Sequence, residues 1–160
     1  MAFALRALLL VCGISVLFSG VWADGFVRVP CCPKGWHRLD DRCFRVVNKT
    51  KSFSEAEDYC VALEGNLASV RNNIEDEVVR ALIAKDVGAS ATAWIGYNDL
   101  DMEGVFVWTD TASEVFDEFD GADPSTDDED CVLIAADNEV FWEDAPCGDE
   151  AAFVCSQSVS

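Results

Sequence analysis

The chain has 160 residues, 51 % of them hydrophobic, which is enough for one domain with a buried core but hardly for two. Its 30 acidic side chains against 11 basic ones give a formal charge of −19. Such a surface repels nucleic acid and anionic membranes, which excludes both as partners. The charge either favours cations or simply keeps the protein soluble.

The N-terminal residues have the layout of a secretory signal peptide. A single Arg6 precedes the apolar run LLLVCGISVLF, and the small-residue pattern VWA offers a cleavage site after Ala23. No later stretch approaches the ~18 apolar residues that a membrane helix needs. We therefore expect residues 1–23 to be removed and residues 24–160 to be secreted as a single domain with a charge of −20, since the basic count falls from 11 to 10.

A hairpin-like loop and a strand open the mature chain. The stretch CPKGWHRLDDRC, residues 32–43, has the length of such a loop, and FRVVN, residues 44–48, predicts a strand. Asn48-Lys49-Thr50 is an acceptor pattern for N-glycosylation, which is meaningful in an exported protein. We expect a glycan on Asn48.

The segment SFSEAEDYCVALEG, residues 52–65, predicts a first amphipathic helix. Ser54 and Glu57 have the spacing of a capping box, in which each side chain bonds to the backbone amide of the other. Gly65 stands where a left-handed C-terminal cap is expected.

A second helix is predicted in NNIEDEVVRALIAKD, residues 72–86. Asn73 is the expected N-terminal cap, and acidic residues fill the first turn, where they complement the helix dipole. Ile74, Val78 and Leu82 recur at helical spacing and predict the buried face.

Short apolar runs replace the helical pattern in the second half of the chain. The runs are TAWIGYN, VFVWTD, CVLIAA, EVFWED and AAFVC, and their β-branched and aromatic residues predict strands. Residues 110–130 lack periodicity and carry much of the charge. Helices followed by strands predict an α+β domain, whose long, loop-rich middle needs disulfides or a metal ion to order it.

Removal of the signal peptide takes Cys12 with it and leaves an odd number of cysteines. In an oxidising compartment these residues form disulfides. Zinc is disfavoured, because the chain has one histidine, His37, and no CxxC pair. An odd count leaves one thiol over, or pairs it with another chain. The cysteines are Cys31, Cys32, Cys43, Cys60, Cys131, Cys147 and Cys155.

Taken together, these motifs resemble the C-type lectin-like domain over residues 32–155. The resemblance is carried by CPKGW at 32–36, GNLAS at 65–69, WIG at 94–96, EDC at 129–131, FWED at 141–144 and FVC at 153–155. It implies an α+β fold in which two helices pack on short, mainly antiparallel strands with a long irregular loop region, stabilised by disulfides. Small secreted fish lectins and type II antifreeze proteins have a similar character, and the resemblance implies binding rather than catalysis.

The resemblance also implies the disulfides Cys32–Cys43, Cys60–Cys155 and Cys131–Cys147. The second of these closes the longest loop and would contribute about 4–5 kcal/mol in the chain-entropy model. Cys31 is then the remaining cysteine. It is a candidate for a bridge to a second copy in a disulfide-linked homodimer, and the alternative is a thiol capped by a small molecule.

Calcium-dependent members of the resembled family hold Ca²⁺ between a triplet centred on proline, a later Glu, and a pair of residues that follows a Trp. Such a hard cation requires several oxygen ligands. By position, the ligands here are Asp123, Ser125, Glu129, Glu143 and Asp144. The resemblance implies sugar contacts from the first four of these residues. An auxiliary calcium site matches Asp99, Glu103, Asp127 or Asp128, and Asp130 more loosely.

Two departures weaken the match at the sugar. Ser125 and Glu143 stand where the mannose pattern has asparagines, whose side chains both ligate calcium and donate a hydrogen bond to a sugar hydroxyl. A carboxylate cannot donate, and each unpaired polar partner costs ~1–3 kcal/mol. Four carboxylates remain for calcium. The triplet Asp123-Pro124-Ser125 matches neither the mannose nor the galactose pattern, so it names no sugar.

Less specific interpretations compete with a metal site. The acidic residues also fit a solvated, self-repelling loop. The pattern D-x-D-x-E-G that begins at Asp99 fits the start of an EF-hand, but its flanks predict strands instead of helices. The tryptophans are expected to fill the core, and no base is arranged beside a Ser or Cys nucleophile, so no enzyme is predicted.

We therefore expect a secreted, calcium-dependent lectin that binds glycans in innate defence. The alternative is a lectin-like fold that binds a protein, a mineral or ice without sugar, as type II antifreeze proteins do. The charge disfavours ice binding, because a protein surface that binds ice is expected to be flat and rather uncharged. It suits a calcium mineral or a basic partner.

Overall fold

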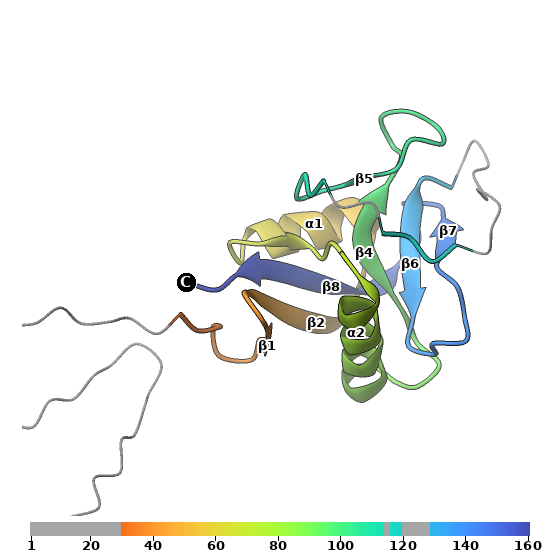
Figure 1. The fold of residues 1–160 in the computed structure, drawn as a ribbon. Coiled ribbons are helices and arrows are strands. Elements are labelled where there is room, and N and C mark those ends of the chain that lie inside the picture. Colours follow the sequence, from red (N-terminus) through yellow and green to blue (C-terminus); the bar gives the residue numbers. More distant parts are fainter. Residues whose placement is uncertain (1–29, 114–115, 120–128) are drawn as a thin grey trace, which may run out of the picture.

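The computed structural model describes residues 30–113, 116–119 and 129–160 (Figure 1). The predicted signal peptide and its cleavage site lie outside these residues, as do Asp123, Ser125, Asp127 and Asp128. No helix among the described residues is long and apolar enough to cross a membrane.

One sheet and two helices make up the described chain. The strands follow the order β1-β2-β8-β4-β6-β7, while β3 pairs with β8 and β5 pairs with β4. Neighbouring strands are antiparallel except β4 and β8, which run parallel. The elements are β1 (His37–Leu39), β2 (Arg42–Lys51), α1 (Phe53–Val61), β3 (Asn66–Leu67), α2 (Asn73–Asp86), β4 (Thr92–Asn98), β5 (Val107–Trp108), β6 (Cys131–Ala135), β7 (Glu143–Ala145) and β8 (Ala151–Ser158). The predicted α+β fold is confirmed.

The N-cap of helix α1 lies two residues before the predicted cap. Ser52 is the N-cap and forms the capping box with Glu55, so the prediction of Ser54 and Glu57 is wrong. Glu57 instead accepts hydrogen bonds from the Asn66 side chain at 2.6 Å and from the Leu67 amide at 2.7 Å. Glu57, which local spacing assigned to the helix cap, therefore makes a tertiary contact with β3 instead.

The turn after α1 uses Gly65 for close packing. Glu64, with φ of 63°, occupies the left-handed conformation that was predicted for Gly65. A Cβ on Gly65 would lie 2.4 Å from the carbonyl oxygen of Ser156 on β8. Glycine is thus required here because another strand passes too close for a side chain.

The cap of α2 and part of its buried face also differ from prediction. Asn72, not Asn73, is the cap, and its side chain accepts from the amides of Ile74 and Glu75 at 3.0 and 3.1 Å. Leu82 is buried as expected, but Ile74 is 64 % exposed. The buried face also contains the polar residues Glu75, Asp76 and Arg80 beside Val79, Leu82 and Ile83.

The three predicted disulfides are confirmed. They join Cys32 to Cys43, Cys60 to Cys155 and Cys131 to Cys147. Cys31 is disulfide-bonded as well, and no cysteine in the described ranges is free. A single chain does not test a bridge between chains, which stays a prediction.

Tryptophans fill the core, as expected. Trp94, Trp108 and Trp142 are buried, and Trp36 packs partly buried against the cluster around Phe153. Asn48 is exposed at the far end of β2, where its amide donates to the Asp86 carbonyl at 3.0 Å. An exposed amide is the geometry that glycosylation requires, although the glycan itself stays a prediction.

Candidate metal centre

The register of three strands brings separated acidic residues together. Asn98 at the end of β4 pairs with Cys131 at the start of β6, and the Asp99 amide donates to the Asp130 carbonyl at 3.1 Å. On the other side of β6, Val132 pairs with Asp144 of β7. Asp99, Asp130 and Asp144 therefore occupy adjacent strand ends, and the disulfide between Cys131 and Cys147 links two of the segments.

Asp144 is a buried carboxylate without compensation. It is 7 % exposed, and within the described residues neither of its side-chain oxygens has a hydrogen-bond partner. Burial raises the pKa of this carboxyl to about 7, and the charge of Asp99 adds to the rise. Glu129 and Asp130 raise the pKa further, while the Ala145 amide opposes it in part. An isolated buried carboxylate is so unfavourable that it takes up a proton or a cation.

Asp99 has the same character. Its side chain is 1 % exposed; Oδ2 accepts from the Gly104 amide at 2.8 Å, but Oδ1 has no partner among the described residues. Within the described residues, three buried carboxylate oxygens on Asp99 and Asp144 thus lack a donor. Calcium binds through several oxygens of this kind, so the chemistry of these groups suits the ion.

The structure unites residues that the sequence assigned to two separate sites. Glu129 and Asp144, predicted for the main site, lie close enough to interact electrostatically, and so do Asp99 and Asp130 of the auxiliary set with Asp144. Both sets therefore contribute to one acidic cluster, which we define as Asp99, Glu129, Asp130 and Asp144. Sequence reasoning could not place Asp99 beside Asp144, because only the strand register relates them.

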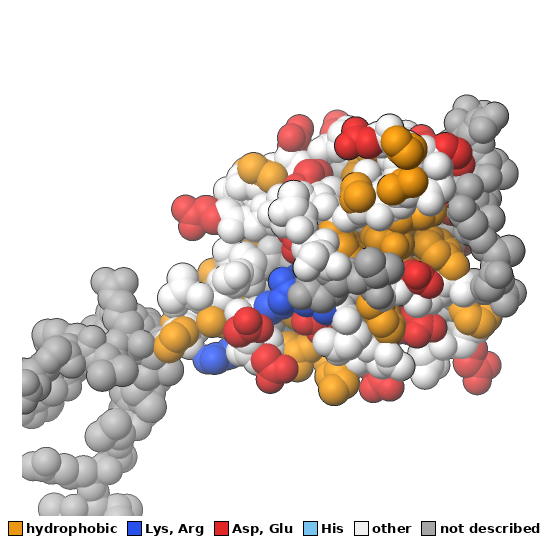
Figure 2. Space-filling model, turned by 45° about the horizontal axis from the view of Figure 1, so that its top comes forward, with side chains coloured by type: hydrophobic (Ala, Val, Ile, Leu, Met, Phe, Trp, Pro, Cys, Tyr) orange, Lys and Arg blue, Asp and Glu red, His pale blue; other side chains and the backbone are white. Residues whose placement is uncertain are grey.

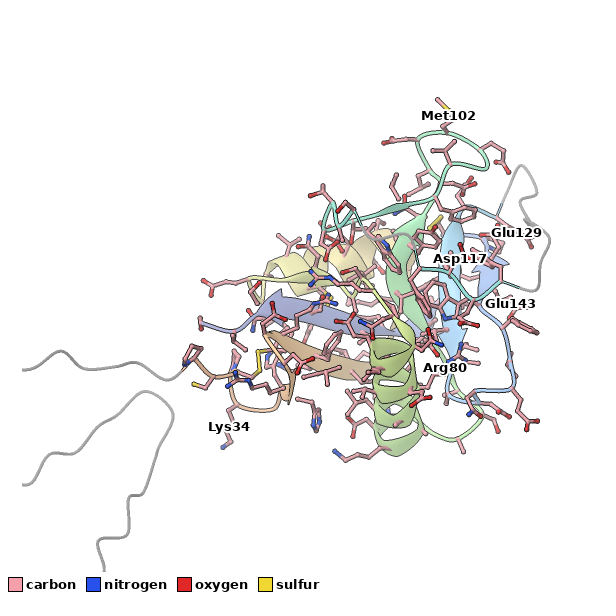
Figure 3. All side chains as sticks on the ribbon, viewed as in Figure 1. Lys34, Arg80, Met102, Asp117, Glu129 and Glu143 are labelled. Atoms are coloured by element: carbon pink, nitrogen blue, oxygen red, sulfur yellow. A yellow bond between two sulfur atoms is a disulfide. The ribbon has the colours of Figure 1, made fainter. Side chains whose placement is uncertain are left out.

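Two other predicted ligands, Glu143 and Glu103, are exposed. Glu143 directly precedes the buried Asp144 on β7. Figure 3 shows Glu129 and Glu143 on the same side of the molecule, beside β6 and β7. Glu103 is exposed in the β4–β5 loop.

The described part of the chain holds no group of three or more His, Cys, Asp or Glu side chains arranged for a metal ion. The acidic cluster is therefore one part of a calcium site at most. The predicted ligands Asp123 and Ser125 lie outside the described residues, so the complete set is a prediction.

A buried ion pair on α2 anchors the segment that leads from β6 to β7. Nε of Arg80 on α2 donates to Asp76 at 2.5 Å, and its Nη1 donates to the carbonyls of Ala135, Asp137 and Val140 at 2.9–3.0 Å. The other Asp76 oxygen accepts from the Trp142 indole at 2.9 Å. Helix α2 thus holds the segment just before Asp144. The signal in the sequence was the i, i+4 spacing of Asp76 and Arg80.

Known proteins match both the sequence and this architecture. The lectin C-type domain matches residues 49–157. The chain is 32 % identical over 119 residues to ladderlectin from Oncorhynchus mykiss, a match covering 73 % of this chain and 63 % of ladderlectin. It is 31 % identical over 130 residues to the galactose-specific lectin nattectin from Thalassophryne nattereri, covering 80 % of this chain and 81 % of nattectin.

Solved structures share the fold. The herring type II antifreeze protein superposes with a TM-score of 0.73 at 25 % identity, covering 81 % of this chain and all of that one. A calcium-independent type II antifreeze protein gives a TM-score of 0.73 at 26 % identity, covering 82 % of this chain and 98 % of the other.

Proposed function

Because the chain belongs to the lectin C-type domain family, we propose that it is a secreted lectin that binds glycans through a calcium ion held beside β6 and β7. Family membership also agrees with the prediction that the chain is not an enzyme. The observation that carries the proposal is the pair of buried Asp144 oxygens that have no hydrogen-bond partner in the described part of the chain, beside other acidic residues. A divalent cation compensates such a cluster more fully than protons do at neutral pH.

The residues divide between ion and sugar. Glu129 and Asp144 are proposed to ligate the ion together with Glu143, Asp123 and Ser125, while Asp99 and Asp130 supply nearby negative charge. Calcium supplies open coordination positions that accept sugar hydroxyl oxygens. Glu129 and Glu143 accept hydrogen bonds from those hydroxyls, and Ser125 donates one.

Galactose is the first sugar to test, because nattectin is galactose-specific by name. Binding to immobilised galactose and mannose is measured with calcium and with chelator, for the wild type and for Glu129→Gln. Glu77→Gln, an exposed acid on α2, is the charge-matched control. We expect calcium-dependent retention that Glu129→Gln abolishes and Glu77→Gln preserves. The proposal is contradicted if the protein binds no glycan on an array in the presence of calcium, or if its retention on immobilised sugar persists in chelator.

Secretion and glycosylation are part of the same proposal. Exported lectins act in innate defence on glycans of microbes or mucus, and the predicted signal peptide and Asn48 acceptor suit that location. Mass spectrometry of the expressed protein checks both points. We expect material in the medium that begins at Asp24 and carries a glycan on Asn48; retention of residues 1–23 contradicts the expected processing.

A second candidate function is binding without sugar, to a protein, a mineral or ice. The likeness to a calcium-independent type II antifreeze protein favours it. Thermal hysteresis and adsorption to calcium carbonate separate these outcomes from glycan binding. The formal charge of −19 predicts adsorption to the mineral and weak or absent hysteresis.

A further inference from the structure

Four large apolar side chains are exposed on one short segment, at the tip of the β4–β5 hairpin. Isolated exposed apolar residues are ordinary, but several together mark interaction sites. Met102 lies at the far end of this loop, away from the sheet (Figure 3). The apolar tip consists of Leu100 (55 % exposed), Met102 (64 %), Val105 (51 %) and Val107 (45 %).

The tip is held by bonds within its own loop. The Met102 amide donates to the Asp99 carbonyl at 3.0 Å, and the Val105 amide donates to the Met102 carbonyl at 2.9 Å. The Gly104 amide donates to the buried Asp99 carboxylate at 2.8 Å. The loop conformation is thus fixed before any partner arrives, which lowers the entropy lost on binding.

A cleft of about 710 Å³ adjoins the tip, and Val107 belongs to both. Its wall contains Tyr97, Phe106 and Trp108, whose rings pack with centroid distances of 5.1 Å from Tyr97 to Phe106 and 4.4 Å from Tyr97 to Trp108. Acidic Asp101 and Glu57 also line it. The cleft has the volume of a site for a few side chains or a small ligand.

Charge decides which partner fits. Asp101 and Glu103 alternate with the apolar residues of the tip, and Figure 2 shows acidic side chains beside hydrophobic ones at this end of the molecule. A second copy carries the same formal charge of −19 and is repelled, as is an anionic membrane. The complementary partner presents apolar side chains among Lys or Arg residues.

We propose that the apolar tip and the adjoining cleft bind a cationic amphipathic segment of another protein. Its apolar face covers Met102 and Val105 and enters the cleft, and its basic residues meet Asp101, Glu103 and Glu57. This surface shares no residue with the sugar ligands of the proposed function, so lectin activity and partner binding can fail independently.

A Leu/Lys amphipathic peptide tests the inference by calorimetry in calcium, with a Ser/Lys peptide of equal charge as the measure of non-specific attraction. We expect Met102→Ser/Val105→Ser to weaken the Leu/Lys peptide about tenfold, the scale set by losing a small apolar contact. Ile74→Ser, which removes an equally exposed apolar side chain from α2, leaves affinity unchanged. Added galactose does not compete.

Several results would overturn the inference. Equal affinity of the wild type and Met102→Ser/Val105→Ser, at equal melting temperatures, removes the tip from the interface. Equal affinity for the Leu/Lys and Ser/Lys peptides would show that charge alone accounts for the binding. If the protein binds neutral phosphatidylcholine vesicles but not the peptide, the tip binds a lipid surface. If the wild type is a dimer and the double variant is a monomer, the tip serves self-association.

Discussion

Asp144 is a residue whose burial opposes the stability of the fold and which is proposed to bind a cation. Its carboxylate is buried, unpartnered within the described chain and close to Asp99, Glu129 and Asp130. In the absence of a cation these charges repel one another in a medium of low polarity. If the proposed ion binds here, the same arrangement would give it its largest electrostatic gain, so the cost in stability would favour affinity for the cation.

Protonation of Asp144 makes the apo protein sensitive to pH. Its folded-state pKa of about 7 exceeds the ordinary value of 3.8, so the folded state binds more protons between these limits. The contribution of this group to the free energy of unfolding is therefore complete below about pH 4. It is lost as pH rises toward 7, by about 1.4 kcal/mol per pH unit. Urea unfolding in chelator at pH 4.5 and 7.5 measures the change.

Asp144→Asn is the matched variant for this prediction. We expect it to be more stable than the wild type in chelator at pH 7.5, and to lose the part of the pH dependence that the wild type owes to this group. Identical pH dependence in the two proteins would show that Asp144 does not titrate in this range.

Position 65 must be glycine because the neighbouring strand β8 leaves no room for a side chain. Gly65→Ala places a Cβ 2.4 Å from the Ser156 carbonyl, so the backbone of β8 must shift. We expect a loss of about 1–3 kcal/mol, typical of overpacking, measured by denaturant unfolding. Gly148→Ala is the control, because nothing lies within 4 Å of its added Cβ. Equal stability of the two variants would contradict the close packing of β8 on the α1–β3 turn.

Among the secondary-structure elements, helix α2 is bonded to the end of β6 and to the segment that leads to β7. Arg80 joins Asp76 to the carbonyls of Ala135, Asp137 and Val140, and Asp76 joins Trp142. The guanidinium has several donors in a fixed plane, which one ammonium group cannot reproduce. The position of Asp144, two residues after Trp142, therefore depends on α2.

Replacing Arg80 should damage both stability and ion binding. Arg80→Met leaves the Asp76 carboxylate buried without its cation, and we expect a loss of about 3–5 kcal/mol in unfolding experiments. Calcium affinity falls as well, because the segment before Asp144 loses its anchor. Lys85→Met, an exposed residue on the same helix, should change neither property. A stable Arg80→Met protein with wild-type calcium affinity would separate α2 from the site.

At the scale of the whole molecule, disulfides of different loop length should contribute differently. The link between Cys60 and Cys155 closes 95 residues, and that between Cys32 and Cys43 closes 11. The chain-entropy model gives about 4–5 and about 3 kcal/mol respectively. Paired alanine variants, compared by denaturant unfolding, check the order; a larger loss at the short loop would contradict a chain-entropy origin.

The sequence predicted what depends on local pattern and failed where contacts between distant segments decide. Cysteine placement and the WIG and FWED motifs led to the right fold and disulfide pairing. The predicted cap at Ser54 was wrong because Glu57 bonds to β3 instead of to the helix end. Ile74 was wrongly assigned to the core because helical periodicity alone cannot show which face of a helix the sheet covers. The convergence of Asp99 with Asp144 follows from strand register, which no local pattern contains.

Calcium binding by Asp144 and its acidic neighbours is the basis of the proposed function. The most direct test is calcium titration by calorimetry at pH 7.5, with wild type, Asp144→Asn and the Glu77→Gln control. We expect one or more binding sites, and we expect the tightest of them to be lost or weakened at least tenfold, about 1.4 kcal/mol, in Asp144→Asn alone. No calcium binding by the wild type, or equal binding by Asp144→Asn, would contradict it.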